Sequence, residues 1–409
     1  MLLSAKNIFM FIIAGIIIIF LQYFSLKLIP GESKLVTPLI FGSGISLIGI
    51  FLYNSLFQKG IKYNKLDFVI LLFFVNMIIS AAMANMYWGQ SFFSSLVGYR
   101  FFYIYFLYFV LIFLKMGSED AEKLVKVFFF LSIAVFLIDV VTFPNPLFAY
   151  RDEERRGGMT IFFFGQGFTF LGGFYYLDRF IHKKKVLYLL YFLLSAICLF
   201  ALTQSRMNLI ALAAGALLIL LMGNWKYKYL ISALFVVASF VIYNSLSFFE
   251  NFKDANENEI QYYQENVRVE AQHYFLTELQ AGVPTILFGN GFPAKDGRLT
   301  DKYENAKLLG LFTSDVGLTG FYSYFGVFGV IIWILLFLAA FRLKNNGNSG
   351  YLKAYFLTLL TSAFTGYSIF EPGYMPATVL ALFLIRCQME SNDTDSINIE
   401  DKGLINIQS

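Results

Sequence analysis

The sequence predicts an all-α polytopic membrane protein with about twelve transmembrane helices and one large outer loop. Hydrophobic residues make up 58% of its 409 residues and charged residues only 14%, against roughly 25% charged residues in soluble proteins. Apolar runs of roughly 17–25 residues, the length that spans a hydrocarbon core, recur along the whole chain. Because backbone groups in lipid must bond within the protein, we expect these unalternated runs to be helices.

The predicted spans follow the limits of these runs. The first is kept as a helix because Gln22-Tyr23-Phe24, which follows it, is not a small-residue cleavage site. The sixth is interrupted by Gly165-Gln166-Gly167 and Gly172-Gly173, so we expect it to be broken or to line a polar cavity. Glu371-Pro372-Gly373-Tyr374 predicts a tight hairpin between the last two spans, and ten or eleven spans remain an alternative. The predicted limits are 7–28, 38–57, 66–84, 96–114, 124–143, 160–177, 186–202, 207–222, 229–245, 315–341, 354–371 and 374–388.

The distribution of Lys and Arg predicts that both termini are cytoplasmic. With the N-terminus inside, 18 of the 31 basic residues fall on the inner side. Of the other 13, six lie in one loop longer than sixty residues, where the positive-inside rule does not apply. The remaining contrast of eighteen against seven supports this orientation, in a cytoplasmic (inner) membrane with the active site facing outside.

Arginine is enriched on the predicted outer side. Five of the seven short-loop outer charges are Arg, whereas only three of the eighteen inner ones are. The planar guanidinium matches phosphate through paired hydrogen bonds and stays charged when partly desolvated. Arg206 has no acidic neighbour in sequence, so we interpret it as an anion contact; Arg151, Arg155 and Arg156 flank Asp152-Glu153-Glu154, and pairing with these acids or with lipid head groups is an equal alternative. The five outer residues are Arg100, Arg151, Arg155, Arg156 and Arg206.

The chain divides around one large polar segment. Residues 1–246 are predicted to hold transmembrane helices 1–9, 247–313 a large extracytoplasmic loop, 314–388 helices 10–12, and 389–409 a disordered cytoplasmic tail. Glu259–Leu279 in the loop has apolar residues near helical spacing, which predicts an amphipathic helix carrying Arg268. Gly289 and Gly291 predict a turn with close backbone approach. The loop is mildly acidic, which excludes a nucleic-acid surface.

Three carboxylates are candidate catalytic bases: Asp315, Asp139 and Glu371. Each is expected near the outer end of a span, where low-dielectric surroundings would raise the pKa of a carboxyl group. Asp315 is also a candidate helix N-cap, as is Ser314, and Asp139 is equally well interpreted as a polar packing contact. The two Cys and two His residues have no metal-ligand spacing, and we find no Asp-x-Asp cluster, so no metal and no cofactor is expected.

Four short motifs appear in a fixed order between Thr203 and Val330. Their order resembles the O-antigen polymerase and ligase superfamily, which includes the Wzy-type polysaccharide polymerases. The length and the predicted twelve-helix outline extend that resemblance to the whole chain. The motifs are Thr203-x-Ser205-Arg206 opening a small-residue helix, an outer loop with the Arg268 helix, Phe288-Gly289-x-Gly291, and Ser314-Asp315-x-Gly317-x-x-Gly320 before Phe325-Gly326-x-x-Gly329.

The resemblance implies a membrane-embedded, metal-independent glycosyltransferase of the C type. Its donor and acceptor would be polyprenyl-diphosphate-linked oligosaccharides, and Arg206 and Arg268 would contact the donor's diphosphate. Ligases of this superfamily carry a candidate base His at the loop-to-span junction, whereas this chain has Ser314-Asp315 there, which favours a polymerase. Besides membrane lipid, a chain-length regulator and a flippase are candidate partners. An O-antigen ligase, a lipid-linked glycan flippase, another polytopic transporter and a scaffold remain alternatives.

Overall fold

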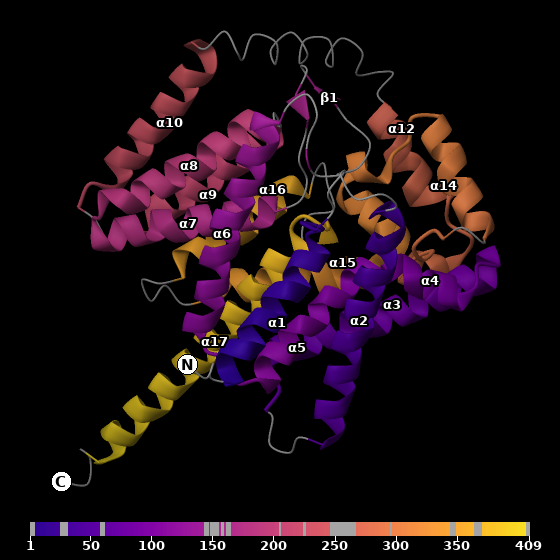
Figure 1. Cartoon of the computed structure of the whole chain (residues 1–409), viewed down its shortest axis with the longest axis horizontal. Helices are drawn as coiled ribbons and strands as arrows, with labels where there is room; N and C mark the ends of the chain where they lie inside the picture. The colour runs from indigo at the N-terminus through magenta and orange to yellow at the C-terminus, as the bar shows by residue number, and fades with distance from the viewer. Residues whose placement is uncertain are drawn as a thin grey trace.

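The computed structural model is built from helices that form two packed groups (Figure 1). The structure describes residues 5–24, 32–57, 62–142, 147, 155–156, 159–160, 165–203, 206–223, 226–245, 267–294, 297–343, 349–363 and 370–405. The all-helical membrane class predicted from the sequence is confirmed, and the strands in these ranges are one pair of two residues each.

The first half of the chain alternates long and short helices. The predicted fourth span lies in one helical segment, Phe92–Phe113, which changes from α-helix to 3₁₀-helix near residue 99 and then back to α-helix. The elements are α1 (Ala5–Phe20), α2 (Glu32–Phe57), α3 (Lys65–Trp88), α4 (Phe92–Gly98), η1 (Tyr99–Tyr105), α5 (Phe106–Phe113), α6 (Ser118–Val141), β1 (Arg155–Arg156) and β2 (Met159–Thr160).

The second half starts with helices that are short for membrane spans and ends with a long helix. Its elements are α7 (Gln166–Lys183), α8 (Val186–Thr203), α9 (Arg206–Met222), α10 (Lys228–Ser245), α12 (Val267–His273), the π-helix η4 (Tyr274–Glu278), α13 (Val283–Phe288), α14 (Arg298–Leu308), the 3₁₀-helix η5 (Thr313–Val316), α15 (Leu318–Phe341), α16 (Gly350–Ser362) and α17 (Met375–Ile405).

Five segments among the described residues are long and apolar enough to cross a membrane by length and composition. Several other apolar helices are shorter, including Lys6–Phe20 and Asn208–Met222. The count of twelve spans therefore stays a prediction, although membrane embedding is supported. The five segments are Leu35–Phe57, Lys65–Trp88, Phe92–Phe113, Ser118–Val141 and Leu318–Phe341.

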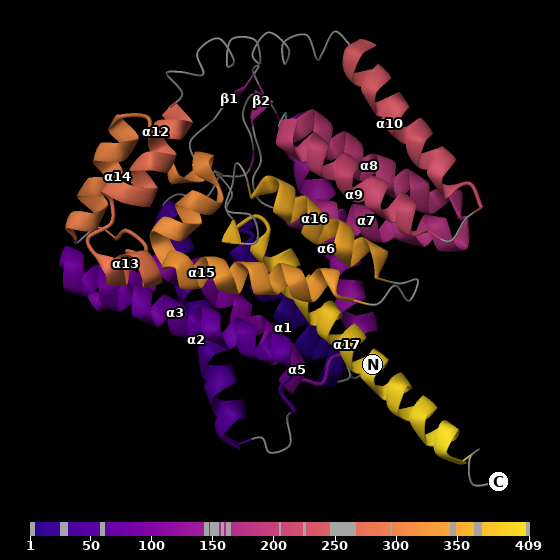
Figure 2. The ribbon, with the colours of Figure 1, turned by 180° about the vertical axis from the view of Figure 1, so that it is seen from behind.

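One helical group contains α6 to α10 with α16, and the other contains α2 to α5 with α13 and α15. Helix α17 joins them, because it contacts α6 and α7 in the first group and η1 and α5 in the second. Seen from behind, α13 lies at one end of α15 beside α3, with α12 and α14 beyond it (Figure 2). We call α12, η4, α13 and α14 the lobe.

The tail predicted over 389–409 is described as far as residue 405. Helix α17 continues through residue 405 and projects away from the two groups (Figure 1). No proline or glycine falls between Ala377 and Lys402, so nothing in this stretch breaks a helix that is already nucleated by packing. The ion pair between Arg386 and Glu390 at i,i+4, with a Nη2–Oε1 distance of 2.7 Å, supports its continuation.

The amphipathic helix expected over Glu259–Leu279 is described only from Val267. It forms α12 and then widens into the π-helical turn η4. Ala271, Phe275 and Leu279 are its buried side chains, whereas Val267 is 45% exposed. The predicted apolar face thus includes Ala271 and Leu279, and the π-helical turn brings Phe275 into that face.

Candidate functional site

A buried polar layer joins the starts of three helices that are far apart in sequence. The hydroxyl of Tyr374 lies 3.1 Å from Oε1 of Gln166 and 3.4 Å from Oδ1 of Asn208, so it donates to one of these oxygens at a time. Gln166 is the first residue of α7, Asn208 lies in the first turn of α9, and Tyr374 directly precedes α17. All three side chains are at most 9% exposed. We call them the polar layer.

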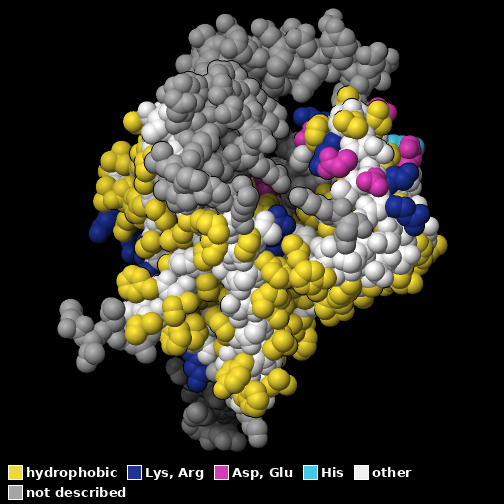
Figure 3. Space-filling view, turned by 45° about the vertical axis from the view of Figure 1, so that its right-hand side comes forward, with side chains coloured by type: hydrophobic (Ala, Val, Ile, Leu, Met, Phe, Trp, Pro, Cys, Tyr) yellow, Lys and Arg dark blue, Asp and Glu magenta, His cyan; other side chains and the backbone are white. Residues whose placement is uncertain are grey.

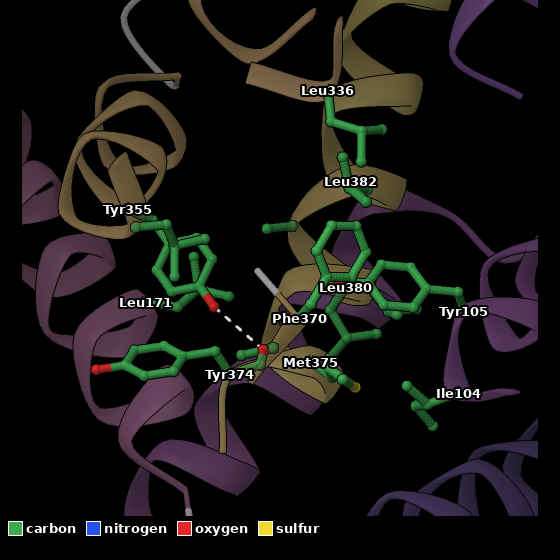
Figure 4. Close-up of a cluster of buried hydrophobic side chains, with 14 of the residues drawn as sticks. Ile104, Tyr105, Leu171, Leu336, Tyr355, Phe370, Tyr374, Met375, Leu380 and Leu382 are labelled. Atoms are coloured by element: carbon green, nitrogen blue, oxygen red, sulfur yellow. Dashed lines mark hydrogen bonds between the residues drawn. The ribbon is translucent and has the colours of Figure 1, made fainter. Parts of the chain in front are cut away.

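The polar layer is held by the hairpin predicted from Glu371 to Tyr374. The amides of Tyr374 and Met375 donate to the Glu371 carbonyl at 2.9 and 3.0 Å, which turns the chain into α17. The Gly167 amide donates to the Gly373 carbonyl at 3.1 Å and fixes the start of α7 against this turn. The Tyr355 hydroxyl donates to the Tyr374 carbonyl at 3.3 Å (Figure 4).

Phe370 connects the same hairpin to the other helical group. Its ring is stacked on Phe321 of α15 with centroids 4.5 Å apart, and on Phe73 of α3 at 4.6 Å. Tyr105 and Phe102 of η1 lie within 6 Å of it, and Figure 4 shows Phe370 between Tyr105 and the Tyr374–Met375 turn. Aromatic contacts of this kind are each worth about 0.5–1.5 kcal/mol beyond burial, so Glu371 is held next to a rigid cluster.

Arg206 is placed at the edge of the polar layer by its helix. It is the first residue of α9 and precedes Asn208 by two positions; its side chain lies outside the described residues. The free N–H groups and dipole at a helix start favour negative charge. Through the contact between Asn208 and Tyr374, the first turn of α9 meets the hairpin that carries Glu371, although about 165 positions separate Arg206 from Glu371 in sequence.

The other two candidate carboxylates lie in different settings. Asp139 on α6 is buried, with 2% of its surface exposed. Asp315 is exposed in η5, where the Ser314 hydroxyl donates to its Oδ1 at 3.2 Å. The N-cap interpretation of Ser314 and Asp315 is wrong, because α15 is capped by Gly317 without a side-chain hydrogen bond. Asp315 is thus separated from α15 by a turn rather than built into its start.

The remaining predicted arginines fall into three positions. Arg268 is exposed on α12, and α12 packs against η5, the element of Asp315. Arg100 is half-buried in η1; its Nη1 donates to the Val97 carbonyl at 3.2 Å, and its guanidinium lies 5.0 Å from the Phe101 ring centre. Arg155 and Arg156 form β1, which pairs with β2; their side chains, and all of Arg151, lie outside the described residues.

Gly289 and Gly291 form the predicted close backbone approach, and its partner is α15. The amides of Asn290 and Gly291 donate to the Ser323 and Tyr324 carbonyls at 2.9 and 3.1 Å. Gly289 has φ +85°, and a Cβ there would lie 2.1 Å from the Tyr324 carbonyl oxygen. Only glycine fits such a position, so this turn serves packing between the lobe and α15.

Four residues of this region were not predicted from the sequence as site residues: Gln166, Asn208, Tyr374 and Phe370. Signals for three of them are present: Gln166 lies between Gly165 and Gly167, Asn208 lies two residues after Arg206, and Tyr374 closes the predicted hairpin. Phe370 has no such signal, because it is one of 50 Phe residues and only the tertiary packing distinguishes it.

Two further charge clusters, one buried and one half-buried, lie away from the polar layer. Arg386 of α17 pairs with Asp67 of α3, with Nη1–Oδ2 at 3.1 Å, and Asp67 also accepts from the Tyr108 hydroxyl at 2.5 Å. Arg179 of α7 pairs with Glu122 of α6 at 3.2 Å. Beside the second pair, burial raises the pKa of Asp178 to about 6, against the opposing charge of His182. Within the described part of the chain, no group of three or more His, Cys, Asp or Glu side chains could hold a metal ion.

No protein-family model matches the chain, and no curated protein matches it either.

Proposed function

We propose that this protein polymerises polyprenyl-diphosphate-linked oligosaccharide repeat units into O-antigen, capsular polysaccharide or exopolysaccharide at the outer face of the cytoplasmic membrane. The observation that carries the proposal is the convergence of the Arg206 helix start and the Glu371 hairpin on the polar layer. A permanent cation at the start of α9 and a carboxylate in the hairpin would suit a reaction that expels an anion and transfers a proton to a base.

The proposed reaction is a glycosyl transfer with diphosphate as leaving group. A hydroxyl oxygen of the acceptor glycan forms a bond to the anomeric carbon of the donor, and the bond from that carbon to the diphosphate oxygen breaks. The electron pair leaves with the polyprenyl diphosphate, whose charge Arg206 and the start of α9 would stabilise as it grows. Arg268 on the lobe would contact the same diphosphate. No metal is required for this stabilisation.

The acceptor proton needs a base, and Glu371 is the residue that the geometry favours. It is half-buried, and the turn it begins leads directly to Tyr374, which contacts Asn208 near Arg206. Asp139 is buried on another helix, and Asp315 is exposed beside α12. Asp315 and Arg268, on contacting elements, would then serve donor or acceptor binding at the lobe.

Deletion of the gene, with surface and lipid-linked glycans resolved by size, tests the proposal. A polymerase predicts collapse of a ladder to a single repeat unit. Long polymer retained on the lipid carrier would instead identify a ligase, and repeat units trapped on the inner leaflet a flippase. An unchanged ladder would contradict all three readings.

Substitution of Arg268 separates the lobe from the helix-start site. We expect Arg268→Ala to abolish long-chain product while the protein still inserts, and Arg268→Lys to recover it only in part, since Lys lacks the planar fork. The chain length on a glycan gel, normalised to protein abundance in the membrane, measures this. A full ladder from Arg268→Ala would remove the lobe from the proposed diphosphate site.

A further inference from the structure

The exposed surface of the lobe is mainly polar on α14 and apolar on α13. On α14 the exposed side chains are mainly polar or charged, among them Asp301, Lys302 and Glu304. On α13 the exposed side chains are Val283, Ile286 and Leu287, which are 67%, 38% and 36% exposed. Figure 3 shows charged side chains gathered on the upper part of this region and hydrophobic ones along its lower edge.

The segment after α13 enters between two candidate membrane-spanning helices. A Cβ on Gly291 would meet the Ala84 side chain and the Ser80 carbonyl of α3, four to eight residues before that helix ends at Trp88. At 1.5 Å per residue, this is about 6–12 Å inside the end of α3. The contact on α15 is Tyr324, six residues and about 9 Å from its start at Leu318. Both helices therefore place residues 289–291 at the same depth.

Helix α15 is kinked at this depth, and the segment packs against the kink. Gly326 has φ +66°, which breaks the regular helix, and its Cα packs directly on the Leu287 and Gly289 backbone. The carbonyls released by the kink are bonded again by other groups. The Tyr324 carbonyl accepts from the Ser80 hydroxyl and the Gly291 amide, and the Phe325 carbonyl accepts from Nδ2 of Asn76 at 2.9 Å. Irregular backbone is tolerated at membrane depth only where it is buried and bonded in this way.

Polar groups at the start of α13 are hydrogen-bonded within the protein. Thr285 is fully buried, and its Oγ1 accepts from the amides of Ala281 and Gly282 at 3.0 and 3.2 Å while donating to the Gly282 carbonyl at 2.8 Å. Pro284 has no N–H to satisfy at the helix start. The Phe288 ring stacks on Phe328 of α15 at 4.9 Å. The apolar face of α13 is thereby continuous with the exposed face of α15, which includes Phe328 and Ile331.

We propose that residues 283–292 are a re-entrant segment, with α13 lying in the membrane on the lobe's side and Val283, Ile286 and Leu287 in contact with lipid acyl chains. The lobe is then anchored to the bilayer by α13 and exposed to water through α14. This inference is independent of the proposed enzymatic function, and it moves residues 283–292 out of the extracytoplasmic loop predicted over 247–313.

Nitroxide labels on single cysteines test the placement. Variants Val283→Cys and Ile286→Cys would be made with Cys198 and Cys387 replaced by Ala. Lys302→Cys on α14 is the aqueous control, and Ile331→Cys on α15 is the lipid control. All four positions are exposed, so each label should be accommodated without loss of fold, which a single gel-filtration peak would verify.

The labelled proteins would be reconstituted into phosphatidylethanolamine–phosphatidylglycerol vesicles and compared by power saturation with oxygen and a nickel chelate. We expect labels at 283 and 286 to favour oxygen over nickel as strongly as the label at 331, and the label at 302 to show the reverse. Nickel accessibility at 283 and 286 equal to that at 302 would overturn the proposal. Low accessibility to both reagents would also overturn it, because the face would then be covered by protein.

Discussion

Helix α17 carries two buried polar clusters that are built in opposite ways. At Arg386 a charged pair with Asp67 is completed by the Tyr108 hydroxyl and Glu390. About 18 Å from it along the axis of α17, Tyr374, which directly precedes this helix, contacts the neutral amides of Gln166 and Asn208. The first cluster pairs one guanidinium with two carboxylates and joins α3 to α17. The second is formed by uncharged side chains beside the starts of α7 and α9.

Removing one partner of the charged pair should have the largest effect on stability. Arg386→Ala leaves Asp67 fully buried without its cation, which typically costs about 3–5 kcal/mol. Unfolding in mixed micelles titrated with dodecyl sulfate would measure this loss. The double variant Asp67→Asn/Arg386→Met, which removes both charges, should recover much of it. A decrease of less than about 1 kcal/mol in the free energy of unfolding of Arg386→Ala would show that this ion pair contributes little to holding α3 against α17.

A Cβ added to the turn that packs against the α15 kink should lower the free energy of unfolding somewhat less than Arg386→Ala does. Gly289→Ala puts alanine at φ +85° and ψ 170°, a backbone region almost restricted to glycine that costs about 1–3 kcal/mol, and brings the new Cβ against the Tyr324 carbonyl. Gly282→Ala is the matched control at the start of α13, since a Cβ there meets its neighbours only at 3.8 Å. Equal stability of the two variants in the same titration would contradict the close approach of the lobe to α15.

Removing a hydrogen-bond donor from the polar layer should lower the free energy of unfolding less than Arg386→Ala or Gly289→Ala does. Tyr374→Phe removes the donor shared by two buried amide oxygens, for an expected loss of about 1–2 kcal/mol. Because the layer adjoins the proposed site, we also expect shorter glycans from this variant. Tyr53→Phe, at a residue that is 64% exposed, is the control and should change neither. Unaltered stability and chain length in Tyr374→Phe would separate the polar layer from the site.

Breaking an ion pair that is exposed to water should lower the free energy of unfolding least. Lys307 and Glu304 on α14 are 2.6 Å apart but about half exposed. Lys307→Ala is therefore expected to cost only about 0.2–0.5 kcal/mol. A loss close to that of Arg386→Ala would mean that α14 is buried rather than water-facing.

Composition and apolar periodicity predict the helical membrane class, but they do not predict how the helices end. The predicted span 96–114 starts four residues after α4 does and contains the 3₁₀-helix η1, and α16 ends at Ser362 rather than near 371. Likewise the turn at Gly289 and Gly291 is readable from its glycines, whereas its partner, the kink at Gly326 in α15, is 37 residues away. Such boundaries depend on tertiary contacts that local pattern does not contain.

The candidate site, like the helix boundaries, could be predicted from the sequence only in part. Arg206 and Glu371 are visible as charged residues at the ends of apolar runs, and the structure places their elements together. The neutral residues that connect them, Gln166, Asn208 and Tyr374, come from three separate parts of the chain. An aromatic residue such as Phe370 becomes informative only when Phe73 and Phe321 are seen to stack on it.

The central claim is that the start of α9 binds the diphosphate of a lipid-linked glycan, and Arg206 tests it most directly. Cells lacking the native gene would be complemented with Arg206→Ala, Arg206→Lys or the control Arg342→Ala, at the exposed C-terminal cap of α15. At equal membrane abundance, we predict single repeat units from Arg206→Ala, a shortened ladder from Arg206→Lys and a full ladder from Arg342→Ala. A full ladder from Arg206→Ala would contradict the account.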